Sequence, residues 1–204
     1  MSDTCMAIQK RLDTLPMFKF PFSKRLIPED GIYFFYEEGE YWGHGGSKER
    51  VVHVEAHTKG KLADDLEKHF NEEYPNMHLT KGMYEALSNM DKRRASKGRS
   101  ERDFIEMLRR RLSFRFIVVD REAEGSELDR YLASVLSECL YCTPSRDWIG
   151  NESSDPKVRS SGMWRPPKEG RSMTKRELDL FERYLEMTYR WLERKGILAP
   201  VLNY

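Results

Sequence analysis

The sequence predicts an α+β fold: a small mixed or antiparallel β-sheet flanked by helices, with an additional C-terminal helix. Two runs of β-forming residues, at 32–36 and 50–57, are separated by a glycine-rich loop and predict a hairpin. A near-continuous apolar run at residues 113–120 predicts a third strand in the centre of the sheet. Segments with apolar residues at helical spacing separate and follow these strands.

The N-terminal part of the chain predicts a helix followed by an extended segment. Residues 1–15 are weakly amphipathic and form a helical extension in this interpretation. The next stretch, LPMFKFPFSKRLIPEDG, contains three prolines, which preclude a helix and favour an extended strap. Its phenylalanines alternate with other residues, so one face of the strap is expected to lie on the core.

The hairpin has the clearest strand and turn signals in the sequence. Its first strand, at 32–36, follows Asp30-Gly31 and is expected to end in an acidic turn at 37–39. Three glycines between residues 43 and 46 mark a flexible loop. The stretch RVVHVEAH then supplies the partner strand.

Helices are expected at residues 61–70, 80–89, 104–112 and 125–140 from the spacing of their apolar residues. A charged loop or helix end is expected at 91–103, and a loop follows the last of these helices. The clearest helix is at 174–195. It begins with the capping box Thr174-x-x-Glu177 and stops at Gly196.

The C-terminal helix has an apolar seam, with Leu178, Phe181, Leu185 and Leu192 among its members. Such a seam packs on the body of the same chain or joins two copies in a homodimer. We therefore divide the chain into a helical extension (1–15), an α+β domain (16–166) and a C-terminal helix (167–204).

Composition narrows the class of protein. The 204 residues have an apolar fraction of 39%, a charged fraction of 34% and a formal net charge of +1. A nucleic-acid-binding face must therefore be local. No apolar run is long enough for a membrane helix, and the first 15 residues lack the apolar core of a secretory signal. Three cysteines make no disulfide framework, so we expect a cytoplasmic protein.

Several short motifs occur in a fixed order. Gly31-Ile32-Tyr33 opens the first strand, RVVHVEAHT forms the second, and a helix with Leu62, Leu66 and His69 follows. Glu127 then lies early in a helix after the strand FRFIVVD, and PSRDWIG and SGMW come last. Together these segments, over residues 18–164, resemble the GIY-YIG nuclease superfamily and its restriction-type branch.

The resemblance implies a divalent-metal-dependent endonuclease of restriction or defence character that hydrolyses nucleic-acid phosphodiesters. In the family, the GIY tyrosine lies near the attacking water, a helix arginine neutralises the phosphate and a glutamate holds the metal. The catalytic residues implied for this chain are Tyr33, His53, His69 and Glu127. Glu127 would also hold Mg²⁺ or Mn²⁺.

The chain departs from the family pattern at charged positions. The arginine position falls on Asp65, and the glycine of the second motif falls on Glu55. A phosphate about 4 Å from either carboxylate would meet a repulsion on the order of 4 kcal/mol at an effective dielectric of about 20. We therefore expect the family's catalytic activity to be weak or lost.

Two arrangements would restore cleavage. A cation that has moved in the sequence could replace the arginine; the candidates are Lys59, Lys61, Lys68, Arg93 and Arg94. Alternatively, Glu55, Asp65 and Glu127 could form a carboxylate cluster for Mg²⁺ or Mn²⁺. His53 or His69 would then serve as a base or a ligand.

The same residues also have purely structural interpretations. Tyr33 can be a packing residue of a half-buried strand, and Glu127 can be an acid that complements its helix dipole. Cys139-x-x-Cys142 is a single pair, and no second pair completes the four ligands of a zinc site. We expect these cysteines to be buried in a helix.

The segment KRRASKGR, at residues 92–99, carries five cations and no acid. It is either a solvated loop or a segment that follows a phosphate backbone. The candidate contacts to nucleic acid, with DNA as the expected partner, are Lys92, Arg93, Arg94, Lys97 and Arg99. The two resulting hypotheses are a metal-dependent endonuclease and a catalytically degenerate module that binds nucleic acid or a protein.

Overall fold

The computed structural model describes residues 2–44, 48–71, 74–94 and 98–198. Its centre is one antiparallel sheet of strands β1 (Phe18–Lys19), β2 (Gly31–Tyr41), β3 (Glu49–His57) and β4 (Leu112–Val118) in the order β1-β4-β2-β3. The predicted hairpin is β2–β3, and β4 lies inside the sheet as predicted. The α+β class and the C-terminal helix are confirmed.

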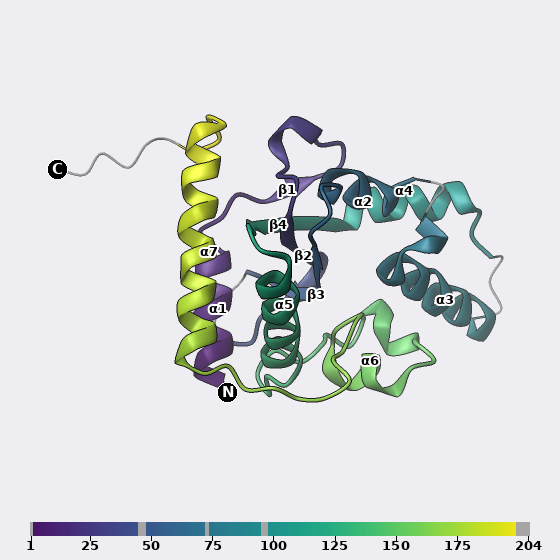
Figure 1. The fold of residues 1–204 in the computed structure, drawn as a ribbon. Helices are drawn as coiled ribbons and strands as arrows, with labels where there is room; N and C mark the ends of the chain where they lie inside the picture. The colour runs from purple at the N-terminus through teal and green to yellow at the C-terminus, as the bar shows by residue number, and fades with distance from the viewer. Residues whose placement is uncertain (1, 45–47, 72–73, 95–97, 199–204) are drawn as a thin grey trace.

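Seven α-helices surround the sheet within the described ranges: α1 (Ser2–Leu12), α2 (Leu62–Lys68), α3 (His78–Arg93), α4 (Glu101–Arg111), α5 (Glu122–Ser137), α6 (Pro156–Ser161) and α7 (Lys175–Arg194). Figure 1 shows α1, α5 and α7 gathered on one side of the sheet and α2, α3, α4 and α6 on the other. Short 3₁₀ turns lie at Lys24–Leu26, Tyr74–Asn76 and Ile149–Glu152. No described helix has both the length and the apolar character needed to cross a membrane.

Helix ends follow the expected capping chemistry. Thr174 and Glu177 form the predicted capping box at the start of α7. A second box, which the sequence analysis missed, is made by Ser100 and Asp103. It starts α4 at Glu101, three residues before the predicted start of that helix.

The apolar seam of α7 packs within the chain. Phe181, Leu185 and Leu192 are buried in the same core as the sheet and α1. Thr188 is buried too, and its Oγ1 accepts a hydrogen bond of 2.9 Å from the Val118 backbone N–H of β4. Packing on the body therefore accounts for the seam, and a homodimer through α7 stays a prediction.

The expected acidic turn at residues 37–39 is wrong, because β2 continues through it to Tyr41. Glu37 and Glu40 are buried, with exposed fractions of 0% and 1%. The Nη2 of buried Arg50 lies 2.7 Å from Glu40 Oε2, and its Nη1 donates to the Gly162 carbonyl at 2.6 Å. Ser145 also donates to Glu40 through its backbone N–H, at 3.1 Å. These contacts fix the segment around residues 145–162 to the hairpin.

Replacing Arg50 with methionine should destabilise the fold strongly, because it leaves the Glu40 carboxylate buried and unpaired. The expected loss is about 3–5 kcal/mol in the free energy of unfolding, measured by urea denaturation. The double variant Glu40→Gln/Arg50→Met buries no net charge and should recover part of this loss. Equal stability of the single and double variants would contradict the role of the pair.

Candidate functional site

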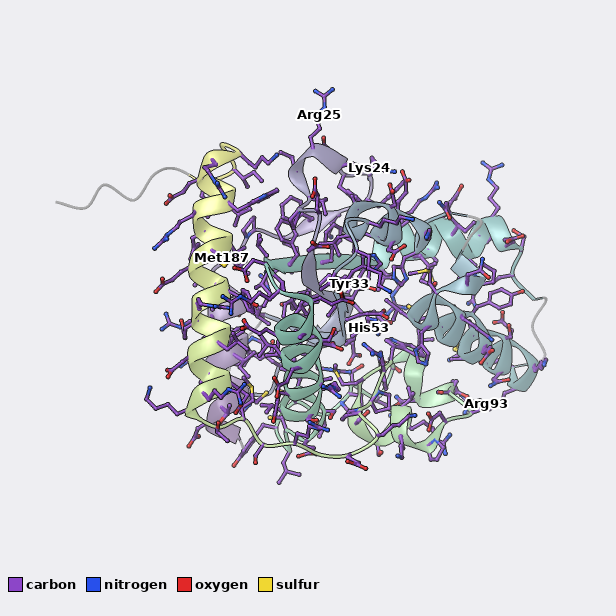
Figure 2. All side chains as sticks on the ribbon, in the orientation of Figure 1. Lys24, Arg25, Tyr33, His53, Arg93 and Met187 are labelled. Carbon is purple, nitrogen blue, oxygen red and sulfur yellow. The ribbon has the colours of Figure 1, made fainter. Side chains whose placement is uncertain are left out.

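Four polar side chains meet on one face of the β2–β3 hairpin and form what we call the Tyr33 cluster: Tyr33, His53, Glu55 and His69. In the strand register Tyr33 lies opposite Glu55 and Phe35 lies opposite His53, so their side chains share a face. His69 directly follows α2 and lies over the same face, with its ring 4.9 Å from that of Phe35. Figure 2 shows Tyr33 and His53 near the centre of the molecule.

Glu55 is the acceptor at the centre of this cluster. Its Oε2 accepts a hydrogen bond from the Tyr33 hydroxyl, with 2.7 Å between the two oxygens, and lies 3.1 Å from His53 Nε2. Since a carboxylate only accepts, His53 donates from Nε2. His69 Nε2 lies 3.5 Å from the Tyr33 hydroxyl, at the outer limit of a hydrogen bond. Three of the four predicted catalytic residues thus lie together.

Burial determines the protonation states of the cluster. Tyr33 is 1% exposed, and both histidines are fully buried. Burial, together with the charge of Glu55, raises the pKa of Tyr33 well above its ordinary value. Burial also lowers the pKa of His53 and brings that of His69 to about 3. Burial opposes ionisation of Glu55, but hydrogen bonds from His53 and Tyr33 outweigh it and hold its pKa low.

The cluster therefore contains a neutral phenol, two neutral imidazoles and one carboxylate. A phenol that donates to a carboxylate and resists ionisation is poorly suited to accept a proton from water. Glu55 is the one member whose side chain reaches solvent appreciably, at 31%. It presents a negative charge where the resemblance would place a phosphate.

Asp65, at the position of the family arginine, is paired with two basic side chains outside the cluster. His57 Nδ1 lies 2.6 Å from its carboxylate, and Lys68 Nζ lies 2.7 Å from it. Lys68, one of the candidate migrated cations, is thus paired with Asp65 itself. Lys59 and Lys61 have no described ion pair.

A cation that the sequence analysis missed, Arg165, lies at the edge of β3. Its Nη1 donates to the Val54 carbonyl at 3.3 Å and to Asp129 Oδ2 at 3.1 Å. Its charge also helps to lower the pKa of Glu55. Arg165 is therefore paired with Asp129 and lies close enough to Glu55 to act on its charge, so it provides little free positive charge for a phosphate.

Glu127 does not join the Tyr33 cluster. Its carboxylate lies 3.9 Å from Arg176 Nη2 of α7. Asp129, two residues further along α5, faces the cluster instead, because two residues of an α-helix are rotated by about 200°. Burial, partly offset by Arg165, raises the pKa of Asp129 to about 6. The structure therefore replaces Glu127 with Asp129 as the α5 carboxylate nearest the cluster.

These positions do not fit the Mg²⁺ or Mn²⁺ site implied by the resemblance. The predicted ligand Glu127 points to α7, and the Asp129 carboxylate is bound to Arg165. Within the described ranges, Glu55, Asp65 and Glu127 do not bring their ligand atoms together as one group. A carboxylate cluster of these three residues is therefore not formed.

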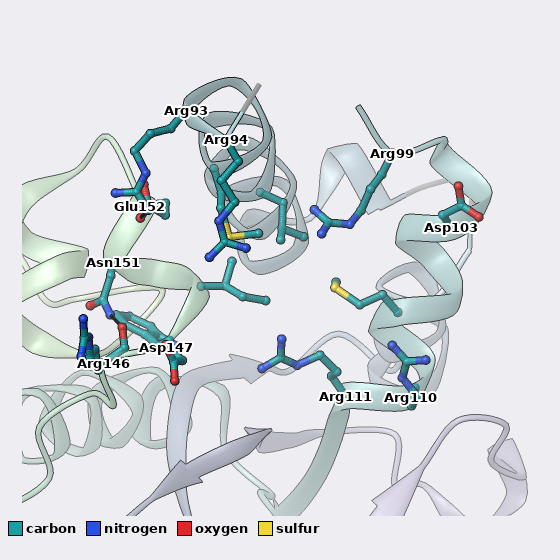
Figure 3. Close-up of a pocket in the computed structure, with 15 residues that line it drawn as sticks. Arg93, Arg94, Arg99, Asp103, Arg110, Arg111, Arg146, Asp147, Asn151 and Glu152 are labelled. Carbon is teal, nitrogen blue, oxygen red and sulfur yellow. Dashed lines mark hydrogen bonds and ion pairs between the residues drawn. The ribbon is translucent and has the colours of Figure 1, made fainter. Parts of the chain in front are cut away.

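A second feature is a cavity of about 800 Å³ between the C-terminal half of α3, the length of α4 and the turn at residues 146–152. Six arginines line this arginine cleft: Arg93, Arg94, Arg99, Arg110, Arg111 and Arg146. Figure 3 shows them arranged around one hollow from several segments of the chain. Six arginines and three acids give the lining a formal net charge of +3.

Half of these arginines have acidic partners. Arg93 pairs with Glu152, Arg99 pairs with Asp91 at 3.0 Å, and Arg111 lies 3.3 Å from Glu37. No carboxylate of the described residues lies within ion-pairing distance of the other three. These three unpaired guanidinium groups belong to Arg94, Arg110 and Arg146.

The cleft includes three of the five predicted nucleic-acid contacts: Arg93, Arg94 and Arg99. Lys92 lies beside a smaller cavity, and Lys97 lies outside the described residues. The sequence signal for the remaining arginines was the run 109–111 and the arginine of PSRDWIG. Neither motif revealed that they face the same cavity, since they are separated by the whole of β4 and α5.

No family model, curated protein or solved structure matches this chain. The resemblance to the GIY-YIG nucleases therefore stays a prediction, and the chemistry of the site is inferred from its own geometry.

The buried His69 should make stability depend on pH. Its pKa falls from about 6.5 in the unfolded chain to about 3 in the fold, so the unfolded chain binds more protons between these values. The contribution of neutral His69 to stability is complete above pH 6.5 and is lost as the pH falls towards 3.

His69→Met removes this titration. Between pH 7 and pH 5 the natural chain should lose about 1–2 kcal/mol more stability than the variant, as measured by urea denaturation at each pH. The raised pKa of Asp129 has the opposite effect on the pH dependence of stability. Because Asp129 is present in both proteins, its effect cancels when their curves are compared. Parallel pH curves for the two proteins would refute the assignment.

Proposed function

We propose that this protein binds the phosphate backbone of nucleic acid in the arginine cleft, without the metal-dependent cleavage of the nucleases that it resembles. The observation that carries the proposal is the convergence of six arginines on one cavity, three of them without an acidic partner among the described residues. The whole chain has a formal net charge of only +1, so this local charge is not a property of the entire surface.

The chemistry of the cleft favours contacts with phosphate over contacts with bases. Guanidinium groups present forked N–H donors that match phosphate oxygens. Among the described residues that line the cleft, the one aromatic side chain is Trp148, which is only 2% exposed and donates its Nε1–H to Glu37. It offers no open ring on which a base could stack. We therefore expect binding that depends little on sequence.

The cleft and the Tyr33 cluster are related through β2. Glu37 contacts Arg111 at the wall of the cleft, and Tyr33 lies four residues earlier on the same strand face, about 13 Å away at the rise of a β-strand. A bound backbone would thus lie on the same side of the sheet as Tyr33. The buried phenol and the negative charge of Glu55 support binding without cleavage there.

The unpaired arginines can be tested together. Arg94→Gln/Arg110→Gln/Arg146→Gln should weaken binding of a fluorescent oligonucleotide about 10–100-fold at low salt, as measured by anisotropy. On duplex DNA, the slope of log affinity against log salt should also fall in magnitude by about 2–3, because each lost phosphate contact removes about 0.9.

The matched control removes the same charge from α7, with Arg176→Gln/Arg190→Gln/Arg194→Gln. Figure 1 places α7 on the opposite side of the molecule from α3 and α4. This control should bind like the natural chain. An equal loss of affinity in both variants would mean that net charge alone, and not the cleft, determines binding. Unchanged affinity in the cleft variant would rule out the proposed interface.

Cleavage should be weak or absent. Plasmid DNA incubated with the protein and Mg²⁺ or Mn²⁺ should remain supercoiled, whereas the same preparation binds the oligonucleotide. Tyr33→Phe removes the hydroxyl hydrogen bond to Glu55 but leaves the cleft intact, so it should not change affinity. Robust nicking that disappears in Tyr33→Phe would establish an active nuclease and overturn the degenerate interpretation.

A further inference from the structure

Three segments that are distant in the sequence bring four metal-binding side chains together. Cys5 belongs to α1, His44 follows β2 in the hairpin loop, and Cys139 and Cys142 lie in the turn after α5. Their ligand atoms all lie within 4.8 Å of one another. The three cysteines are buried and His44 is half-buried. None of the four belongs to the arginine cleft or the Tyr33 cluster.

The distances match a tetrahedral ion. Cys5 Sγ and Cys142 Sγ are 3.7 Å apart. Two sulfur ligands of one tetrahedral Zn²⁺ are about 3.8 Å apart when each Zn–S bond is about 2.3 Å. His44 Nε2 lies 3.1 Å from Cys139 Sγ, a few tenths of an ångström inside the corresponding nitrogen–sulfur edge. A disulfide would need about 2.05 Å between sulfurs.

Aromatic side chains support the histidine ligand. The His44 ring lies between those of Trp42 and Tyr141, at 5.7 and 5.2 Å, which fixes its orientation.

Gly43 shows that the hairpin loop and the cysteine turn must approach closely. A Cβ at this position would lie 1.6 Å from the Tyr141 carbonyl oxygen, so no larger residue fits without moving the backbone. This close approach places His44 against the Cys139–Cys142 turn.

We propose that Cys5, His44, Cys139 and Cys142 bind one Zn²⁺ ion in a closed structural site. The expectation that Cys139-x-x-Cys142 lacks partners is wrong, because folding supplies Cys5 from a position 134 residues before Cys139 and His44 from the hairpin. The two cysteines also lie after α5, which ends at Ser137, and not within a helix.

Zinc is the ion that this donor set favours. Three sulfurs and one imidazole nitrogen in tetrahedral proximity are the ligands of structural Zn²⁺ sites. Ligand atoms this close together surround a single ion and leave no room for a cluster of several metals. Binding would release the protons of the three thiols and tie α1, the hairpin and the end of α5 together.

The direct test is the metal content of the full chain, purified without chelator and measured by plasma mass spectrometry. We expect about one zinc per chain, together with a fall in melting temperature of roughly 5–15 °C after removal by a chelator and recovery when Zn²⁺ is returned. Replacement by Co²⁺ should give thiolate-to-cobalt charge-transfer bands and the intense visible bands of tetrahedral cobalt.

Variants of His44 avoid disturbing the buried cysteines. His44→Ala should lower zinc affinity at least tenfold. His44→Cys should retain one zinc and shift the cobalt bands to longer wavelength, because a fourth sulfur replaces nitrogen. The control His78→Ala, at an exposed histidine outside the site, should leave zinc content unchanged.

Three outcomes would overturn the proposal. They are a natural chain that binds no stoichiometric zinc after reconstitution, a cobalt complex without thiolate bands, and fewer than three free thiols in the metal-free protein. The last result would mean that two of the three cysteines form a disulfide.

Discussion

Two carboxylates buried at the end of β2 determine how the distant parts of this chain converge. Glu37 accepts hydrogen bonds from the Nε1 atoms of Trp148, at 3.0 Å, and Trp164, at 3.4 Å, and it pairs with Arg111. Glu40 is satisfied by Arg50 and Ser145. A buried carboxylate without such partners would lower the stability of the fold by several kcal/mol. The contacts to Glu37 and Glu40 therefore hold the start of β4 and the segment from 145 to 164 at this end of β2. The same convergence builds a wall of the arginine cleft.

The sequence predicted the elements of the fold where local patterns determine structure. Alternation and β-propensity located β2, β3 and β4, and apolar spacing with the Thr174 capping box located α7. The prediction of a turn at residues 37–39 was wrong because acids in a strand resemble a turn locally. The tryptophans that bind Glu37 lie 111 and 127 residues away, and no local pattern identifies them.

The candidate site was predictable in part for a related reason. Tyr33, His53 and His69 occupy motif positions on a hairpin and at the end of a neighbouring helix. The approach of Tyr33 and His53 follows from strand register, and α2 adds His69. Glu127 did not converge, because an offset of two residues on α5 reverses the direction of a side chain and a short motif does not determine that offset. Arg165 and Cys5 could not be assigned from the sequence, since each acts through contacts that only the tertiary fold creates.

Electrostatics explains how a protein with this fold could bind nucleic acid without cleaving it. Cleavage requires positive charge at a fixed point near the attacked phosphorus, and here that region holds Glu55 and Asp129, with Arg165 paired to Asp129. Attraction of a polyanion requires only that positive charge be concentrated somewhere along its path. In the proposed function the arginine cleft would meet this weaker requirement with guanidinium groups from separate segments, so loss of any one should weaken binding without abolishing it. On this proposal the two sites should respond independently to substitution, although Glu37 and Tyr33 lie on one strand.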